Sequence, residues 1–180
     1  MNIFFGTAGF SYKDWLGVVY PSDLKRRKVH PLTYLARFLD CCEINSSFYG
    51  YIRSNAGKGW CKAVAEVNPS FQFTAKLFQG FTHSARGSKA PVPFTLKVSG
   101  EDEKLAREGL DSIAIEGRLG AVLLQFPISF KNADDTRDYL FGLIRKFNNY
   151  PLVLEIRHES WNDPDILERL IELGVAFLQH

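Results

Sequence analysis

The chain has 180 residues, of which 46% are hydrophobic and 14% aromatic, and a formal net charge of +2. This composition predicts one packed domain over residues 1–180 and excludes a disordered chain. No apolar run reaches the length of a membrane span, no amino-terminal segment has the form of a signal peptide, and the three cysteines have neither disulfide-framework nor metal-ligand spacing. We therefore expect a cytoplasmic protein that does not associate with membranes.

The charge is distributed unevenly along the chain. Residues 1–90 contain 12 Lys and Arg against 5 Asp and Glu, whereas residues 91–180 contain 10 against 15. The basic half includes the run Lys25-Arg-Arg-Lys28, and four consecutive cations can contact nucleic-acid phosphates. Because such a run is more often a solvated loop, nucleic-acid binding is the less favoured interpretation.

Apolar periodicity in the first half of the chain predicts three strands separated by two helices. Turn and cap residues set their bounds, since Gly6-Thr-Ala-Gly9 forms a tight turn, Pro31 opens one helix and Ser54 caps another. The predicted strands are Asn2–Phe5, Cys41–Asn45 and Phe71–Lys76, and the predicted helices run from Pro31 to Phe38 and from Ser54 to just before Pro69.

After a loop-rich region at residues 82–100, the second half of the chain alternates in the same way. Its predicted helices are Glu101–Glu116, a helix from Asp134 or Asp135 to Phe147, and Pro164–Leu173, and its predicted strands are Leu119–Phe126, Leu152–Ile156 and Val175–Leu178. Six strands alternating with five helices predict βα units on one parallel sheet.

A polar side chain stands near the carboxyl end of nearly every predicted strand. These residues are Thr7, Glu43 with Asn45, Lys76, Gln125, and Glu155 with Arg157. An open doubly wound sheet would normally carry a nucleotide-binding glycine pattern after its first strand, and the sequence lacks that pattern. We therefore favour a barrel, in which all these strand ends converge on one mouth.

The strand predicted at residues 152–156 carries the strongest functional signal. Glu155 and Arg157 interrupt an apolar run and, being two residues apart, leave the strand on the same face. A charged pair on a buried strand is costly unless the two groups satisfy each other or a ligand. A structural ion pair and a binding site are equally consistent with this pattern.

Several short motifs occur in order along the chain. They are Gly6-Thr-Ala-Gly-Phe-Ser-Tyr-Lys-Asp-Trp15, Glu43-Ile-Asn-Ser-Ser-Phe-Tyr49, Phe73-Thr-Ala-Lys76 with Thr82-His83, Gln125-Phe-Pro127, and Glu155-Ile-Arg-His-Glu-Ser-Trp161. Together they resemble the YecE-like family, also described as the domain of unknown function DUF72. The resemblance spans essentially the whole chain and implies an α/β fold of the TIM (β/α) barrel type.

The barrel of that family has further strands, whereas this chain ends inside its sixth predicted strand. The resemblance therefore implies about six βα units of a barrel that is incomplete at the C-terminus, and we expect a truncated chain. Six strands cannot close a parallel barrel with its normal tilt, so the first and last strands would present unpaired edges. We accordingly expect the 180-residue chain to self-associate.

The favoured functional hypothesis is a small polar or anionic ligand bound at the C-terminal mouth of the barrel. If the protein is an enzyme, we expect a hydrolase or another acid–base enzyme, with catalytic candidates Glu43, Glu155 and Lys76. The substrate-binding candidates are Thr7, Tyr12, Trp15, Asn45, His83, Gln125, Arg157, His158 and Trp161. Among them Arg157 would hold the anion together with Lys76, and the aromatic residues would cover it.

Other interpretations stay open. The protein binds nucleic acid if the analogy with barrel endonucleases holds, or it is an inactive fragment in which two acids and two bases form a purely structural charge network. Two carboxylates across a barrel mouth would also suit glycoside hydrolysis. A metal is disfavoured because no H-x-H or H-E-x-x-H motif supports one, and the pattern specifies no cofactor.

Overall fold

The chain is built on one sheet of six parallel strands, in a computed structural model that describes residues 3–83 and 98–179. The strands follow one another across the sheet in the order of the sequence, and each is parallel to the next. They are β1 (Gly6–Ala8), β2 (Cys41–Ile44), β3 (Gln72–Lys76), β4 (Leu119–Gln125), β5 (Leu152–Ile156) and β6 (Ala176–Gln179). The predicted parallel α/β alternation is confirmed.

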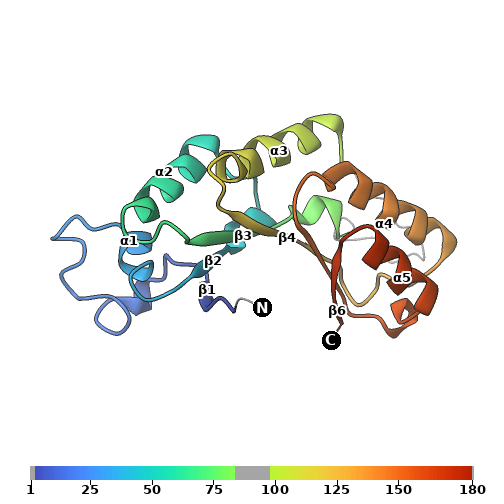
Figure 1. Ribbon diagram of the computed structural model, residues 1–180, viewed down its shortest axis with the longest axis horizontal. Coiled ribbons are helices and arrows are strands. Elements are labelled where there is room, and N and C mark those ends of the chain that lie inside the picture. The colour runs from blue at the N-terminus through green and yellow to red at the C-terminus, as the bar shows by residue number, and fades with distance from the viewer. Residues whose placement is uncertain (1–2, 84–97, 180) are drawn as a thin grey trace.

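A helix lies in each connection between consecutive strands. These helices are α1 (Pro31–Leu35), α2 (Ser54–Ala65), α3 (Gly100–Ala114), α4 (Asp134–Phe147) and α5 (Pro164–Glu172). In Figure 1, α2, α3 and α4 cover one side of the curved sheet, while both chain ends lie on its other side. A parallel sheet in sequence order with its helices on one side is typical of TIM-type folds, whereas doubly wound folds carry helices on both faces. Of the described helices, none combines the length and the apolar character needed to cross a bilayer.

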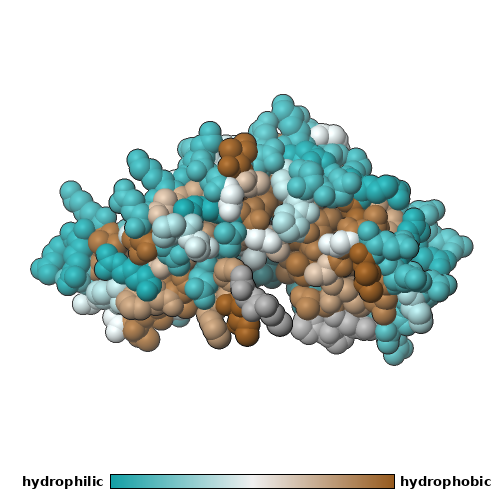
Figure 2. Space-filling view, viewed as in Figure 1, coloured by the Kyte–Doolittle hydropathy of each residue, from teal (hydrophilic) through white to brown (hydrophobic). Residues whose placement is uncertain are grey.

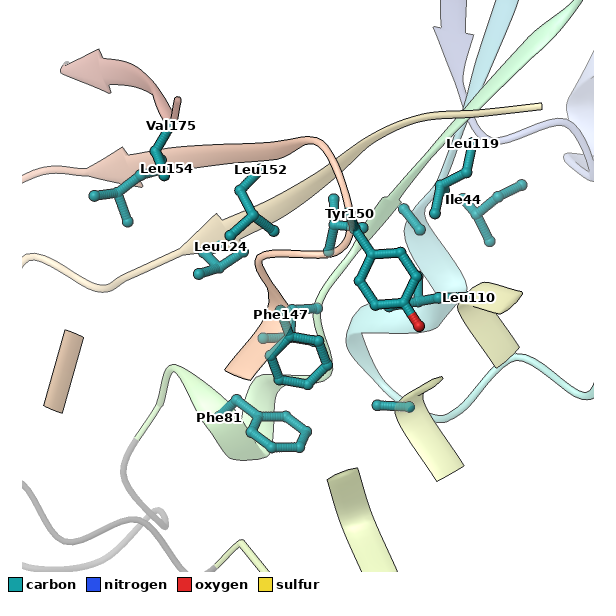
Figure 3. Packing of buried hydrophobic residues seen from close by; sticks show 14 of the residues in the cluster. Ile44, Phe81, Leu110, Leu119, Leu124, Phe147, Tyr150, Leu152, Leu154 and Val175 are labelled. Atoms are coloured by element: carbon teal, nitrogen blue, oxygen red, sulfur yellow. The ribbon is translucent and has the colours of Figure 1, made fainter. Parts of the chain in front are cut away.

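The core lies between the sheet and its helices, because every second side chain of the central strands points beneath the helices. Figure 3 shows Leu124 of β4 and Leu152 and Leu154 of β5 in this cluster, together with Phe81 and Phe147. All five side chains are at most 5% exposed. The apolar face by which each helix was predicted is therefore the face that packs against the sheet.

The opposite face of the sheet, which we call the open face, carries the intervening residues of each strand. On β2 to β5 its members are Cys41, Glu43, Gln72, Thr74, Lys76, Ala121, Leu123, Gln125, Val153 and Glu155. Most of them are half-buried, in contrast to the fully buried positions beneath the helices. In Figure 2 hydrophilic residues cover the helices at the top, and hydrophobic residues gather along the lower side.

The three cysteines illustrate this alternation, and all of them are free thiols. Cys42 is fully buried beneath the helices, whereas its neighbour Cys41 lies on the open face, so the two side chains point to opposite faces of β2. Burial raises the pKa of the Cys42 thiol to about 11. The pKa of Cys61, buried on α2, is likewise raised to about 11, chiefly by burial.

The first strand begins later than its apolar sequence predicts. Strand pairing starts at Gly6 opposite Cys41, and the preceding residues of the predicted strand are irregular, with Asn2 outside the described residues. The N–H of Phe5 donates to Asp40 Oδ2 at 3.0 Å, and its carbonyl accepts from Asp40 N at 2.8 Å. These bonds tie Phe5 to the residue before β2, and Ile3 and Phe5 are left 69% and 68% exposed.

Helix bounds also differ from the prediction where side-chain caps were misassigned. Ser54 is the first residue of α2 and not its cap, because its hydroxyl donates to Glu108 O at 3.3 Å and so joins α2 to α3. Helix α3 is capped by Ser99 and Asp102, a capping box that lies at the end of the predicted loop. Residues 84–97 of that loop lie outside the described residues.

Helices α2 and α3 approach closely because glycines face their interface. A Cβ on Gly109 of α3 would lie 2.6 Å from the carbonyl oxygen of Ile52, which precedes α2. By contrast, a Cβ on Gly59 of α2 would meet nothing within 4 Å. The close packing of α3 against the residue that leads into α2 thus depends on the absence of a methyl group at Gly109.

We expect Gly109→Ala to destabilise the fold by about 1–3 kcal/mol, because overpacking outweighs the better helix propensity of alanine. Gly59→Ala is the matched control and should stabilise by about 0.5–1 kcal/mol, since it gains propensity without a clash. Urea unfolding midpoints of the two variants and the parent measure both effects. Equal midpoints for the two variants would show that the interface has room for the methyl group.

Candidate functional site on the open face

Charged and amide side chains gather near the carboxyl ends of four neighbouring strands of the open face. Lys76 is the last residue of β3 and Gln125 the last of β4, while Glu43 and Glu155 stand one residue before the ends of β2 and β5. The strand register places Gln125 directly beside Glu155 and places Lys76 beside Leu123. Because parallel strands end at the same edge of a sheet, these four side chains lie along one edge of the open face.

Glu155 is the buried centre of the first group, at 6% exposure. Gln125 Nε2 lies 2.7 Å from both carboxylate oxygens of Glu155. Arg157 donates to Glu155 Oε1 from Nε at 3.2 Å and from Nη2 at 3.1 Å. A buried carboxylate with this many donors has its charge compensated locally, so Glu155 fixes the positions of the amide and the guanidinium around it.

Arg157 itself remains accessible, since 51% of its side chain is exposed. Its Nη1 donates no hydrogen bond within residues 3–83 and 98–179. The guanidinium is therefore held on one edge by Glu155 and presents its other edge to solvent. Of the positions proposed from sequence, this is the cation best placed to meet an anion.

Glu43 and Lys76 form the second group. Their charged atoms, Glu43 Oε1 and Lys76 Nζ, are 3.6 Å apart, and their side chains are 25% and 20% exposed. This distance is an ion pair but exceeds a good hydrogen bond, so both groups keep hydrogen-bonding capacity for another partner. Glu43 is thus less constrained than Glu155. The sequence alone gave both as equivalent catalytic candidates, and their contacts distinguish them.

His83 lies near the end of β3 and packs against the segment that follows β2. It follows a short 3-10 helix, Gln79–Phe81, and its Nδ1 lies 2.9 Å from the hydroxyl oxygen of Thr82. Its ring meets Phe48 edge to face at 5.1 Å. Burial, together with the nearby positive charge of Arg157, lowers the pKa of His83 below its usual value, so the ring is neutral near pH 7.

Phe48 was missed by the sequence reasoning, although it belongs to the motif of residues 43–49 that had been singled out. It stands at the end of the 3-10 helix Asn45–Phe48, directly after β2. An aromatic residue three positions after the predicted strand end at Asn45 was the available signal. Asn45 opens that same helix, so strand alternation no longer sets its direction, and its side chain makes no hydrogen bond to the part of the chain that the structure describes.

The candidates near β1 lie apart from the two charged groups. Thr7 pairs in register with Cys42, on the helix-covered face, and its hydroxyl donates to Gly9 O at 2.9 Å. Tyr12 donates to Ala8 O at 2.6 Å, and its ring packs 4.8 Å from that of Trp15. Among the described residues, none of these side chains contacts Lys76 or Arg157: Thr7 belongs to β1 itself, and Tyr12 and Trp15 belong to the connection that follows it.

His158 and Trp161 support the loop after β5. His158 Nδ1 accepts from the N–H of Ser160 at 3.1 Å and so caps the 3-10 helix Glu159–Trp161. Trp161 is fully buried, stacks on Phe130 at 5.0 Å and donates from Nε1 to Phe130 O at 2.8 Å. The structure therefore places Trp161 in the core and not over the open face, where the sequence reasoning had expected a cover for substrate.

Among the residues the structure describes, no group of three or more His, Cys, Asp or Glu side chains is arranged to hold a metal ion. The open face is instead a mixed acid, base and amide surface on a parallel sheet. These features define an α/β protein of the TIM-barrel type with a charged cluster at its strand ends.

The sequence profile of the family described as "Protein of unknown function DUF72" matches residues 4–179, and the chain belongs to that family. The UPF0759 protein YunF of Bacillus subtilis (strain 168) is 27% identical over 174 residues, which cover 97% of this chain and 57% of YunF. The family resemblance inferred from the motifs is thereby confirmed.

Solved structures of the family share this fold. A DUF72 family protein from Enterococcus faecalis V583 superposes with a TM-score of 0.72 at 22% identity, covering 96% of this chain and 58% of that one. A DUF72 family protein from Thermotoga maritima MSB8 gives a TM-score of 0.68 at 29% identity, covering 96% and 63%. The chain thus spans less than two thirds of the length of these relatives, and the match supports the TIM-like α/β fold.

We expect Gln125→Leu to destabilise the fold by about 1–3 kcal/mol, because it removes two hydrogen bonds to a buried carboxylate. Gln72→Leu is the matched control, since Gln72 lies on the same face of β3 and its side chain makes one long hydrogen bond within the described residues, to Ser70 O at 3.4 Å. Its effect should stay within about 0.5 kcal/mol. Urea unfolding compares the two, and equal stabilities would mean that Glu155 does not depend on Gln125.

The lowered pKa of His83 predicts a stability that falls in mild acid. Its folded pKa lies below the unfolded value of about 6.5, so the unfolded state takes up the proton first as the pH decreases. Stability from the neutral ring is therefore complete above about pH 6.5 and is lost as the pH falls through the folded pKa. We expect the difference in unfolding free energy between pH 7.5 and pH 5.5 to shrink in His83→Gln, whereas an unchanged difference would contradict this assignment.

Proposed function

We propose that the open face binds a small anionic or polar ligand at the carboxyl ends of β3, β4 and β5. The observation that carries this proposal is the state of Arg157, which is oriented by Glu155 and is still half exposed. Orienting a guanidinium before the ligand arrives lowers the entropic cost of binding. Its planar edge suits the paired oxygens of a carboxylate or phosphate.

The surrounding groups suit the same ligand. Lys76 supplies a second, partly buried cation one strand away from Gln125, and the amide of Gln125 adds an uncharged polar contact. His83, neutral near pH 7, can donate or accept a hydrogen bond at the same edge of the sheet. Together these groups can recognise both the charge and the hydroxyl or amide groups of a small polar molecule.

If the protein is an enzyme, its two glutamates have different roles. Glu155 accepts hydrogen bonds on both oxygens, and we assign it to positioning Arg157 and Gln125. Glu43 has one ion-pair contact and partial exposure, which makes it the candidate general base. Lys76 beside it would stabilise negative charge that develops on the substrate, as in a hydrolase or another acid–base enzyme.

A glycosidase pair of Glu43 and Glu155 is disfavoured by the contacts of Glu155. That chemistry needs two carboxyl groups that can exchange protons or attack the sugar. The carboxylate of Glu155 accepts hydrogen bonds from Gln125 and Arg157, which leaves it little freedom to act as a nucleophile.

Nucleic-acid binding through the basic run is the alternative. Asp23 Oδ2 accepts from Arg26 at 3.2 Å and from Arg27 at 2.8 Å, so one carboxylate offsets part of the charge of the run. The remaining cations, Lys25 and Lys28, are too few to neutralise a long stretch of phosphates. If this alternative holds, the affinity for nucleic acid should fall steeply with salt concentration and should not depend on Arg157.

A thermal-shift panel of phosphate, sulfate, small carboxylates and neutral sugars tests the proposal. We expect the anions to raise the melting temperature, since a ligand at 100 times its Kd adds about 2.7 kcal/mol to stability. Arg157→Gln should weaken anion binding about tenfold or more, corresponding to loss of a charge-assisted hydrogen bond. Arg145→Gln, which removes an exposed arginine from α4, is the control and should leave binding unchanged.

Two outcomes would contradict the proposal. The first is stabilisation by neutral sugars alone. The second is tight, salt-sensitive binding of an oligonucleotide that survives Arg157→Gln but is lost when Lys25 and Lys28 are replaced by Gln. The second outcome would transfer the function to the basic run and the nucleic-acid interpretation.

A further inference from the structure

The long connection between β1 and α1 is a packed unit of its own. Tyr20 and Leu24 are 3% and 4% exposed and form a second hydrophobic cluster with Leu35 of α1. Phe10, Trp15, Leu16, Val29, Tyr34 and Leu39 pack against this cluster. In Figure 1 this connection is the blue segment at the left end of the molecule, at the opposite end of the sheet from β6. Its internal core shows that it is an ordered structure and not a simple linker.

A cavity of about 230 Å³ lies within this unit. Aromatic and aliphatic side chains form most of its wall, among them Phe10, Tyr12, Leu16, Tyr20 and Leu24. The hydroxyl of Tyr20 donates to Phe10 O at 2.7 Å, and that of Tyr12 donates to Ala8 O at 2.6 Å. Both phenol rings are therefore held in place by the backbone without a ligand, so the cavity is largely preformed.

Two lysines complete the wall, Lys13 and Lys25. Neither makes an ion pair within the described residues, whereas their neighbours Arg26 and Arg27 both contact Asp23. The only other acid between residues 9 and 30 is Asp14, next to Lys13. The polar part of the cavity is therefore positively charged, and its apolar part is rich in rings.

The backbone fixes Lys25 beside the cavity. Lys28 adopts a left-handed conformation with φ of 53°, which a side-chain-bearing residue rarely takes. Its N–H donates to Lys25 O at 3.1 Å, and the N–H of Val29 donates to Leu24 O at 3.3 Å. This closed turn brings Lys25 and Val29 to the same cavity although they are four residues apart.

We propose that this cavity binds a small aromatic carboxylate. The ring would lie among Phe10, Tyr12 and Tyr20, where aromatic contacts favour offset and edge-to-face arrangements. The carboxylate would face Lys13 and Lys25, which supply point charges without demanding the bidentate geometry of arginine. The volume is below that of a drug-sized pocket, so the ligand carries one ring system, and its Kd is expected at roughly 0.01–1 mM.

This site is distinct from the open-face site proposed above. Its side chains belong to the connection after β1, whereas Arg157 and His83 follow β5 and β3. The cavity would recognise a ligand that combines an apolar ring with one negative charge. The protein groups of the open-face site are instead mostly charged or amide side chains. Binding at the two places is separable by mutation, because the two sets of residues do not overlap.

The test is an NMR titration of the chain with phenylacetate, followed through backbone amide shifts. We expect saturable shifts at residues 10–30, and binding at least tenfold weaker for phenylacetamide, which has the same shape without the charge. Inorganic phosphate tests whether charge alone suffices, and cyclohexylacetate tests whether the aromatic ring matters. Both should bind less tightly than phenylacetate.

Variants locate the site. Lys25→Gln and Lys13→Gln should each weaken phenylacetate binding about fivefold or more, and both residues are exposed, so the fold should persist. Lys58→Gln, an exposed lysine of α2, is the matched control, and Arg157→Gln should also leave phenylacetate binding intact. Val29→Phe should abolish binding by filling the cavity, with an otherwise conserved spectrum as evidence of folding.

Three results would overturn the proposal. They are equal affinity for phenylacetate and phenylacetamide, unchanged affinity in both lysine variants, and the absence of saturable binding by any ring carboxylate. Tighter binding of cyclohexylacetate than of phenylacetate would replace the aromatic ligand class by an aliphatic one and so reject the proposal as stated.

Discussion

Burial of alternate side chains beneath the helices is the constraint on which the rest of this structure depends. The strands β2 to β5 supply apolar residues to that side, as Ile44, Phe73, Val122 and Leu154 do, all at 1% exposure or less. The side chains between them point to the open face and can carry charge. The charged candidates Glu43, Lys76 and Glu155 therefore occupy the open face, because an unpaired charge beneath the helices would be costly.

The same constraint explains how much of the fold could be predicted from sequence. The strands from β2 to β5 and the helices between them were predicted from the sequence. The apolar residues that pack between the sheet and its helices recur with the period of a strand or a helix, so the pattern indicates these elements directly. The first strand was placed too early because Ile3 and Phe5 are apolar but exposed, so their hydrophobicity carries no information about pairing. Caps were misassigned where a hydroxyl, as in Ser54, bonds to a distant helix and not to its own.

The candidate site was predictable as a set of strand ends but not as a set of contacts. Glu155 and Arg157 are neighbours in sequence, so their pairing was foreseen as one of two possibilities. The contact between Glu155 and Gln125 spans 30 residues and depends on the register of β4 and β5, which no local pattern encodes. The burial of Trp161 depends on stacking with Phe130 across another loop, and it was likewise invisible in the sequence.

This register also separates the two glutamates that the sequence made equivalent. Glu155 accepts hydrogen bonds from Gln125 at the end of β4 and from Arg157 just after β5, whereas the carboxylate of Glu43, among the described residues, contacts the ammonium of Lys76. Two residues of one chemical type thus differ in burial and in hydrogen bonding because of the strands beside them. In the function proposed above, this difference is the reason for assigning Glu155 to positioning and Glu43 to the role of candidate base.

The buried thiols have a practical consequence for studying motion in this protein. At neutral pH almost none of Cys42 or Cys61 is in the reactive thiolate form, because both pKa values are raised to about 11, and both side chains are shielded. A thiol reagent can modify them only when the covering helices separate from the sheet. Their labelling rates would thus report the opening of β2 and α2, element by element, without any engineered probe.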